Sequence, residues 1–206
     1  MRGADLRAAM LVAVLLVPGG AHAGAQVYEE LAESVRHRMS AALADKAVAE
    51  LVFRDREDAH KWLFEMSRRL EKRVPDRKQR IALLRTVHFE ALRAGLDPQL
   101  VLGIIEVESR FRKYAVSRAG ARGYMQVMPF WVKLIGRRGD NLFHLRTNLR
   151  YGCLILRHYL DMEKGDLYRA LGRYNGSLGR PEYPAMVEGA WRRNWNYGAP
   201  RPVGTR

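Results

Sequence analysis

Cysteine is almost absent from this chain of 206 residues, which contains only Cys153. A single cysteine cannot form an intramolecular disulfide, so a disulfide-stapled fold is excluded. Leu149, Leu156 and Leu160 share a helical stripe with this cysteine, which favours a buried side chain over a reactive thiol. The six histidines are scattered without the spacing of a metal-ligand set. The sequence therefore predicts no metal site and no cofactor.

Apolar runs long enough to span a bilayer are also absent. The short apolar run 8–17 follows Arg2 and Arg7 and precedes Ala21-His22-Ala23, which is the pattern of a cleavable signal peptide. We expect cleavage after Ala23, a periplasmic location if the source is Gram-negative, and no stable membrane anchor. An uncleaved membrane tether is the alternative.

Acidic residues are too few to balance the basic ones, since 36 Lys and Arg face 22 Asp and Glu and the net charge is +14. Such a balance is typical of nucleic-acid binding. However, the chain has no zinc-finger spacing, RNP motif or basic zipper, and we expect export, so we expect no nucleic-acid partner. An acidic cell-surface polymer or an anionic membrane fits an exported cation better. The charge alternatively serves only solubility.

Hydrophobic periodicity predicts a mainly α-helical chain without a clear strand. Asp97, Asn148 and Asp166 are expected to cap the starts of three helices, and Val74-Pro75 to end another. The apolar segment 47–53 is ambiguous. The expected helices cover residues 26–44, 59–70, 77–94, 98–109, 148–165, a stretch after 166, and 183–195.

A domain boundary is expected near Pro75-Asp76. The predicted organisation is a signal peptide (1–23), an N-terminal helical extension (24–75), a main domain (76–195) and a disordered tail (196–206). The tail has two prolines, two glycines and little to bury. We expect a monomer in which the N-terminal helices form either a packing collar or an arm that binds an envelope protein.

Glu108 is a carboxylate on an otherwise apolar helix face. Val101, Ile104, Ile105 and Glu108 follow the i, i+3, i+4, i+7 rule, whereas Glu106 points to the opposite side. Burial among apolar side chains raises the pKa of a carboxyl group, which keeps it protonated near neutral pH and able to donate a proton. Alternatively, the carboxylate snorkels at the edge of the stripe or pairs with an arginine.

The segment after this helix is rich in glycine and lacks carboxylates. Gly120 and Gly123 allow sharp turns that return Met125 and Gln126 toward the glutamate. An amide and an apolar side chain beside a proton donor suit a sugar with N-acetyl groups. Residues 109–139 contain no Asp or Glu, whereas ordinary glycosidases use a second carboxylate. Unless Asp140 or Asp161 approaches, the substrate must supply its own nucleophile.

Several motifs occur in order between residues 80 and 195. They are Glu108-Ser109-x-Phe111, Ala115-Val116-Ser117, Gly120-Ala121-x-Gly123-x-Met125-Gln126-x-Met128-Pro129 and Tyr174-Asn175-Gly176. This series resembles the soluble lytic transglycosylases of glycoside hydrolase family 23, whose catalytic domain is similar to goose-type lysozyme. The chain departs from the family pattern at Arg112-Lys113, at Tyr124 and after Gly176, which affects the expected shape of the subsites.

The resemblance implies a lysozyme-like catalytic domain acting on peptidoglycan glycan strands. Glu108 would be the single acid/base, and the product would be a 1,6-anhydromuramyl end formed without water. The residues implied to bind the sugars are Ser117, Met125, Gln126, Tyr174 and Asn175. Taken alone, Met125 and Tyr174 would more often be core residues, and Ser117 and Asn175 could cap helices or turns. A hydrolytic muramidase and a catalytically silent envelope glycan-binding protein are the alternatives.

Overall fold

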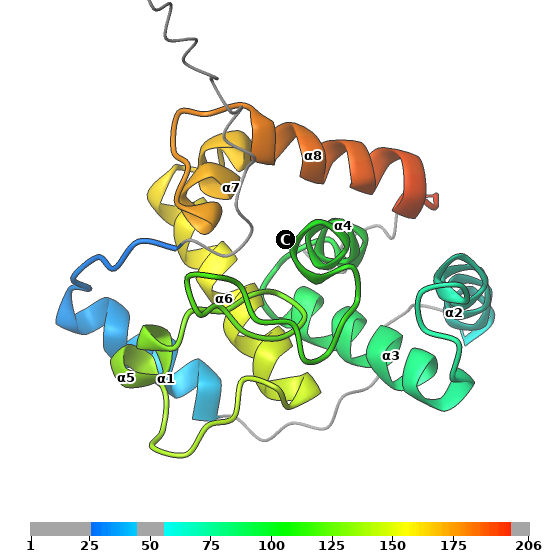
Figure 1. Ribbon diagram of the computed structural model, residues 1–206, viewed down its shortest axis with the longest axis horizontal. Coiled ribbons are helices and arrows are strands. Elements are labelled where there is room, and N and C mark those ends of the chain that lie inside the picture. The colour runs from blue at the N-terminus through cyan, green and yellow to red at the C-terminus, as the bar shows by residue number, and fades with distance from the viewer. Residues whose placement is uncertain (1–25, 45–55, 199–206) are drawn as a thin grey trace, which may run out of the picture.

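The computed structural model describes residues 26–44 and 56–198, and every regular element within them is a helix (Figure 1). The elements are α1 (Glu33–Ala44), α2 (Arg56–Leu70), α3 (Arg77–Arg93), α4 (Pro98–Ser109), α5 (Phe130–Ile135), α6 (Leu145–Met162), α7 (Leu167–Asn175), α8 (Glu182–Ala190) and the π-helix η1 (Trp191–Trp195). The mainly α prediction is confirmed. The expected signal peptide and the segment 47–53 lie outside the described residues.

Helix α4 lies at the centre of the molecule and is seen almost end-on in Figure 1. It packs against α3, α8 and η1, while α6 packs against α3 and α7. Only Glu106 and Val107 of α4 escape full burial. A helix that is apolar on most sides is buried in the core. Because α4 is central, other helices surround its end.

Two of the three predicted N-caps are confirmed. The Asp97 carboxylate accepts a hydrogen bond of 2.7 Å from the main-chain N–H of Gln99, and Asp166 accepts one of 3.0 Å from Arg169. These side chains satisfy main-chain donors that the first turn of a helix leaves unpaired. Helices α4 and α7 therefore begin where the sequence indicates.

The third predicted cap, Asn148, is wrong. Helix α6 begins at Leu145, so Asn148 lies within its first turn and is fully buried. Its side-chain oxygen accepts from the N–H of Met125 at 2.8 Å, and its NH2 group donates to the carbonyls of Arg122 and Leu142 at 2.8 Å each. Asn148 thus fastens the glycine-rich loop to α6 instead of capping the helix.

The N-terminal part differs from the single helix predicted over 26–44. Helix α1 begins only at Glu33, and residues 26–32 are not helical. Helix α2 packs against α3, and its Trp62 and Met66 are buried in the same hydrophobic core as Leu83 and Ile104. The extension therefore shares its core with the rest of the described chain, and a boundary at Pro75 stays a prediction.

The predicted disordered tail does not begin at Asn196. The main-chain N–H of Tyr197 donates to the side-chain oxygen of Gln99 at 2.5 Å, and Arg69 donates to the carbonyl of Asn196 at 3.0 Å. These contacts come from helices distant in the sequence, which composition alone does not indicate. Residues 199–206 lie outside the described part.

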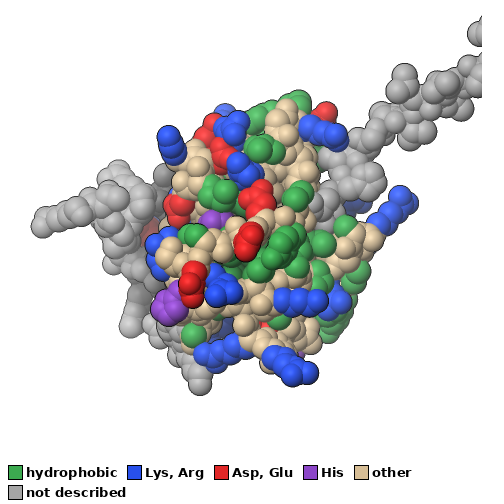
Figure 2. Space-filling view, turned by 90° about the vertical axis from the view of Figure 1, so that its left-hand side faces the viewer, with side chains coloured by type: hydrophobic (Ala, Val, Ile, Leu, Met, Phe, Trp, Pro, Cys, Tyr) green, Lys and Arg blue, Asp and Glu red, His purple; other side chains and the backbone are tan. Residues whose placement is uncertain are grey.

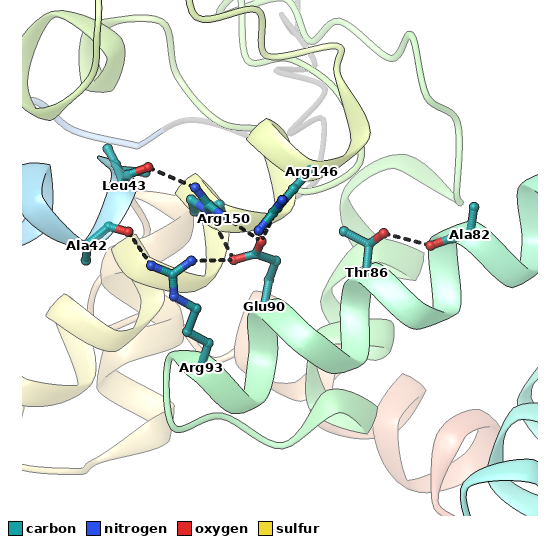
Figure 3. Close-up of polar contacts among 8 residues, drawn as sticks. All are labelled: Ala42, Leu43, Ala82, Thr86, Glu90, Arg93, Arg146 and Arg150. Atoms are coloured by element: carbon teal, nitrogen blue, oxygen red, sulfur yellow. Dashed lines mark hydrogen bonds and ion pairs between the residues drawn. The ribbon is translucent and has the colours of Figure 1, made fainter. Parts of the chain in front are cut away.

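Glu90 on α3 is the centre of a buried ion cluster (Figure 3). Its carboxylate accepts from Arg146 at 3.1 Å and from Arg150 at 3.2 Å, both on α6, and lies 4.0 Å from Arg93. Only 2% of Glu90 is exposed. Arg93 and Arg150 also donate to main-chain carbonyls at the end of α1. The cluster therefore joins α1, α3 and α6.

Acidic and basic side chains are interspersed over the face of the molecule on which α1 and α5 lie (Figure 2). The exposed ion pair of Arg36 with Glu33 on α1 is typical of a solvated helix surface. The net charge of +14 is thus not gathered into a single basic field on this face.

Candidate functional site

Glu108 lies in the last turn of α4, and only 5% of it is exposed. The predicted apolar stripe is present, because Val101, Ile104 and Ile105 on the same face are fully buried. Burial disfavours a charged carboxylate and raises the pKa of Glu108 to about 8. The carboxyl group therefore carries its proton at neutral pH, which is the state that a general acid needs.

Tyr183 is the partner of Glu108. Its hydroxyl donates a hydrogen bond of 2.6 Å to Oε1 of Glu108, and this bond lowers the pKa of the carboxyl group in opposition to burial. Within the described residues, Oε2 of Glu108 is buried and has no hydrogen-bond partner. One oxygen is therefore held in place by Tyr183, while the other has no hydrogen-bond partner among the described residues.

Tyr183 was not predicted from the sequence. It lies at the start of α8, 75 positions after Glu108, and no motif joins the two residues. The only available signal was a tyrosine at the start of the last predicted helix. Helix α8 packs along α4, so the pairing results from tertiary packing.

The loop after α4 folds back as its glycines predict. The N–H of Gly123 donates to the carbonyl of Ala115 at 2.9 Å, and isolated antiparallel bridges join Arg122 to Val116 and Val127. Gly123 has a positive φ of 75°, and a Cβ there would lie 2.5 Å from the Asn148 amide nitrogen. Any other residue would clash or be strained at this position. The turn brings the Met125–Gln126 pair into the core.

Met125 and Gln126 are both buried, but their contacts are with the protein. Met125 packs so closely on α6 that a Cβ on Gly152 would collide with it. The Gln126 amide donates to the carbonyls of Gly123 at 2.9 Å and Ala115 at 3.2 Å. In this arrangement both side chains shape the loop, and their predicted contact with sugars stays a prediction.

Tyr174 and Asn175 end α7 and are buried. The Tyr174 hydroxyl donates to the carbonyl of Met125 at 2.7 Å, so the glutamate is not its hydrogen-bond partner. Burial and then the nearby charge of Glu108 raise the pKa of Tyr174 well above its usual value. Ser117 is half-buried, and its hydroxyl accepts from the N–H of Ala121 at 3.1 Å. Tyr174 thus lies beside Glu108 and supports the loop.

Three other carboxylates, Glu106, Asp140 and Asp161, have partners away from Glu108. Glu106 binds Arg73 at 2.5 Å and accepts from the Trp195 indole at 2.6 Å, on the side of α4 away from Glu108, as predicted. Asp140 accepts from the Tyr151 hydroxyl at 2.6 Å, and Asp161 pairs with Arg157. Among the described residues, no second carboxylate contributes to the raised pKa of Glu108.

Residues 85–184 of the sequence match the family described as the transglycosylase SLT domain. This chain contains an SLT domain. The match includes Glu108, the glycine-rich loop and Tyr183 near its end, and it leaves α1 and α2 outside. The family resemblance inferred from the ordered motifs is confirmed. The mainly α, lysozyme-like fold class that it implied is confirmed as well.

Curated relatives carry related names. A "Transglycosylase" of Enterobacteria phage PRD1 is 32% identical over 103 residues, covering 50% of this chain and 38% of the phage protein. The "Membrane-bound lytic murein transglycosylase C" of Yersinia pestis (strain Pestoides F) is 33% identical over 109 residues, covering 45% of this chain and 30% of that protein. The protein of that name from Actinobacillus pleuropneumoniae serotype 5b (strain L20) is 62% identical over 39 residues, covering 19% and 11%. The chain therefore spans well under half the length of these relatives.

The described residues contain no cluster of three or more His, Cys, Asp or Glu side chains arranged to hold a metal ion. Over the same residues, no helix has the length and apolar character needed to cross a membrane. Cys153 is buried on α6, as its stripe predicts. Glu108 can donate a proton at this site, because burial keeps its carboxyl group protonated at neutral pH.

Proposed function

We propose that this protein is a peptidoglycan lytic transglycosylase in which Glu108 is the only acid/base. The observation that carries the proposal is the buried carboxyl group itself, whose pKa is raised to about 8 by burial and which has one oxygen bound by Tyr183 and the other unbonded in the described structure. The SLT domain and the names of the relatives support peptidoglycan as the substrate.

In the proposed reaction, Glu108 donates its proton to the glycosidic oxygen between N-acetylmuramic acid and N-acetylglucosamine. The bond from this oxygen to muramyl C1 breaks, and the N-acetylglucosamine leaves with a hydroxyl group. The Glu108 carboxylate then accepts the proton of the muramyl C6 hydroxyl as that oxygen bonds to C1. The 1,6-anhydro product forms, Glu108 regains its proton, and no water is consumed.

The surroundings of Glu108 favour this route over hydrolysis. A hydrolase on two carboxylates needs the second as a nucleophile or as a base for water, whereas Asp140 and Asp161 are bound by Tyr151 and Arg157. A single carboxyl group that is first acid and then base suffices when the nucleophile belongs to the substrate. Tyr183 can hold the glutamate in both protonation states, because its hydroxyl donates to either form.

Muropeptide analysis of purified sacculi tests this function. We expect the wild-type protein to release fragments with 1,6-anhydromuramyl ends, and Glu108→Gln to release none above background. Reducing ends would establish the hydrolytic muramidase, and an inactive wild-type protein that still binds sacculi would establish a silent glycan-binding protein. Glu106→Gln is the matched control, since it alters the neighbouring carboxylate that faces away from the site.

We further propose that the protein acts in the periplasm after removal of residues 1–23. The charged start, the short apolar run and Ala21-His22-Ala23 support this location. Mass spectrometry of the exported protein should find an amino terminus at Gly24, and an intact Met1 in the cytoplasm would contradict it. Binding of an envelope protein by residues 24–75 and the monomeric state stay predictions.

A further inference from the structure

The segment ahead of α1 is anchored to the candidate site although it lies outside the SLT domain. In Figure 1 this segment runs from α1 toward α7. Gln26 is 4% exposed, whereas the next residue, Val27, is 55% exposed. A polar side chain buried at the beginning of the described chain needs hydrogen-bond partners. Those partners belong to the loop that carries Met125 and Gln126 and to helix α5, which follows it.

The Gln26 carboxamide binds both sides of a strained turn. Its oxygen accepts from the N–H of Met128 at 3.2 Å and from the indole N–H of Trp131 at 3.1 Å, and its nitrogen donates to the carbonyl of Gln126 at 3.5 Å. Gln126 has a φ of 47°, a region that is unfavourable for residues other than glycine. The Gln26 side chain thus compensates locally for this backbone conformation.

Two further contacts place the segment against the elements of the site. The ring of Tyr28 packs edge-on against Phe130 of α5, with 5.6 Å between centroids. Glu29 accepts from Arg173 of α7 at 3.0 Å, and Arg173 directly precedes Tyr174. Residues 26–29 therefore contact both the loop with Met125 and Gln126 and the helix with Tyr174 and Asn175.

The far end of α1 is also held. Arg93 donates to the carbonyl of Ala42 at 2.6 Å, and Arg150 donates to that of Leu43 at 2.8 Å (Figure 3). Positive side chains at the C-terminal end of a helix satisfy its unpaired carbonyls and its dipole. With Glu90 holding both arginines, the segment 26–44 is attached at each end and is not a free arm.

We propose that residues 26–29 form a strap that sets the shape of the glycan site, with Gln26 as a positioning residue. This inference rests on the proposed function. The strap acts on the loop and on α7, whereas Glu108 and Tyr183 belong to α4 and α8. Loss of the strap should therefore weaken glycan binding and leave the proton transfer unchanged. The SLT domain of residues 85–184 would then be incomplete without a segment from outside it.

Gln26→Ala is the principal variant, and four further variants accompany it. Val27→Ala changes an exposed neighbour of the same segment, and Met39→Ala removes a buried side chain of α1 without touching the strap's contacts. Glu29→Gln and Glu30→Gln form a matched pair, because Glu29 binds Arg173 whereas Glu30 is exposed. The Trp131 indole N–H resonance, one of four in the protein, reports directly on the Gln26 contact.

Two measurements report how these variants change glycan binding and turnover. The first is the Kd of a soluble N-acetylglucosamine tetramer for proteins that also carry Glu108→Gln, so that binding is read without turnover. The second is kcat and KM on sacculi fragments across pH. For Gln26→Ala we expect Kd and KM to rise about five- to tenfold, at most about 1.4 kcal/mol, with kcat and the pH midpoint unchanged. Glu29→Gln should give a smaller rise, and Glu30→Gln and Val27→Ala none.

The outcomes separate the strap from the proposed function. An active wild-type protein with equal KM values for Gln26→Ala and Val27→Ala would overturn the strap alone. Equal rises for Gln26→Ala and Met39→Ala would reduce Gln26 to a stabilising residue and also overturn it. A wild-type protein without lytic activity would overturn the proposed function. The strap would then be tested by the Kd of the tetramer alone. Absence of tetramer binding as well would overturn both.

Discussion

Glu90 and Glu108 are buried carboxylates on neighbouring helices, and their surroundings differ completely. Glu90 on α3 is 2% exposed and faces three arginines, and Glu108 on α4 is 5% exposed and is bound by one tyrosine. The arginines offset the charge of Glu90, and the cluster joins three helices. At Glu108 no cation among the described residues offsets the charge, so the proton is retained. Burial without a counter-charge distinguishes the acid from the structural carboxylate.

The largest expected effect is on activity. Glu108→Gln should lower kcat/KM by at least about a hundredfold, because general acid–base catalysis contributes factors of about 10² to 10⁴. Release of muropeptides under first-order conditions measures it, with circular dichroism as the check on folding. Glu90→Gln should keep the activity of each folded molecule. Equal losses of activity in the two variants would show that Glu108 has no catalytic role that Glu90 lacks.

The second effect is on stability. Glu90→Gln leaves three arginines around a neutral amide, and removal of one member of a buried ion cluster costs about 3–5 kcal/mol. Urea denaturation near neutral pH measures the change. Glu188→Gln is the matched control, because its pair with Arg192 is exposed and such pairs contribute about 0–1 kcal/mol. An equally small loss for Glu90→Gln would show that the cluster is dispensable.

The third effect is the dependence of stability on pH. The pKa of Glu108 is about 8 in the folded protein and near 4.5 when unfolded. Between these values the native state binds a proton that the unfolded chain has released, so the free energy of unfolding falls as pH rises. Glu108→Gln removes this contribution to the pH dependence of the free energy of unfolding. Its stability relative to wild type should therefore increase from pH 5 to pH 8, by about 1.4 kcal/mol per pH unit at most.

That difference is read from denaturation of the two proteins in parallel at several pH values, so that all other titrating groups cancel. A difference independent of pH would mean that Glu108 titrates normally in the folded state. The same reasoning predicts that lytic activity falls as pH rises through about 8, where Glu108 loses the proton that it must donate.

The smallest effect concerns Tyr183. Its hydrogen bond lowers the pKa of Glu108, so Tyr183→Phe should raise that pKa further and move the alkaline limb of the activity profile to higher pH. The pH–rate profile of kcat/KM measures the shift. A limb displaced to lower pH would indicate that Tyr183 stabilises the protonated carboxyl group instead. Tyr168→Phe, on an exposed tyrosine, should leave the profile in place.

Much of the Glu108 site was predictable because it is local. The cap at Asp97, the proline after it and the stripe ending at Glu108 lie within one helix, and the opposite direction of Glu106 follows from the same helical geometry. The return of the loop follows from glycines such as Gly123. Secondary structure that depends on residues close in sequence can be inferred from their spacing.

The remaining contacts were not predictable, because they join distant segments. Tyr183 reaches Glu108 through the packing of α8 on α4, and Asn148 binds the loop although its position resembles a helix cap. The partners of Glu90 on α6 are 56 and 60 positions away. Gln26 is buried although residues 26–32 were expected to be helical. Side-chain chemistry alone does not indicate which distant group will approach.

Titration of the Glu108 side-chain carboxyl group by ¹³C NMR tests the central claim most directly. The Glu108→Gln spectrum assigns the resonance by its absence. We predict a midpoint near pH 8 in the wild-type protein, moving to higher pH in Tyr183→Phe. A midpoint near 4.5, the usual value for a glutamate, would contradict the account, because the carboxyl group would then carry no proton to donate at neutral pH.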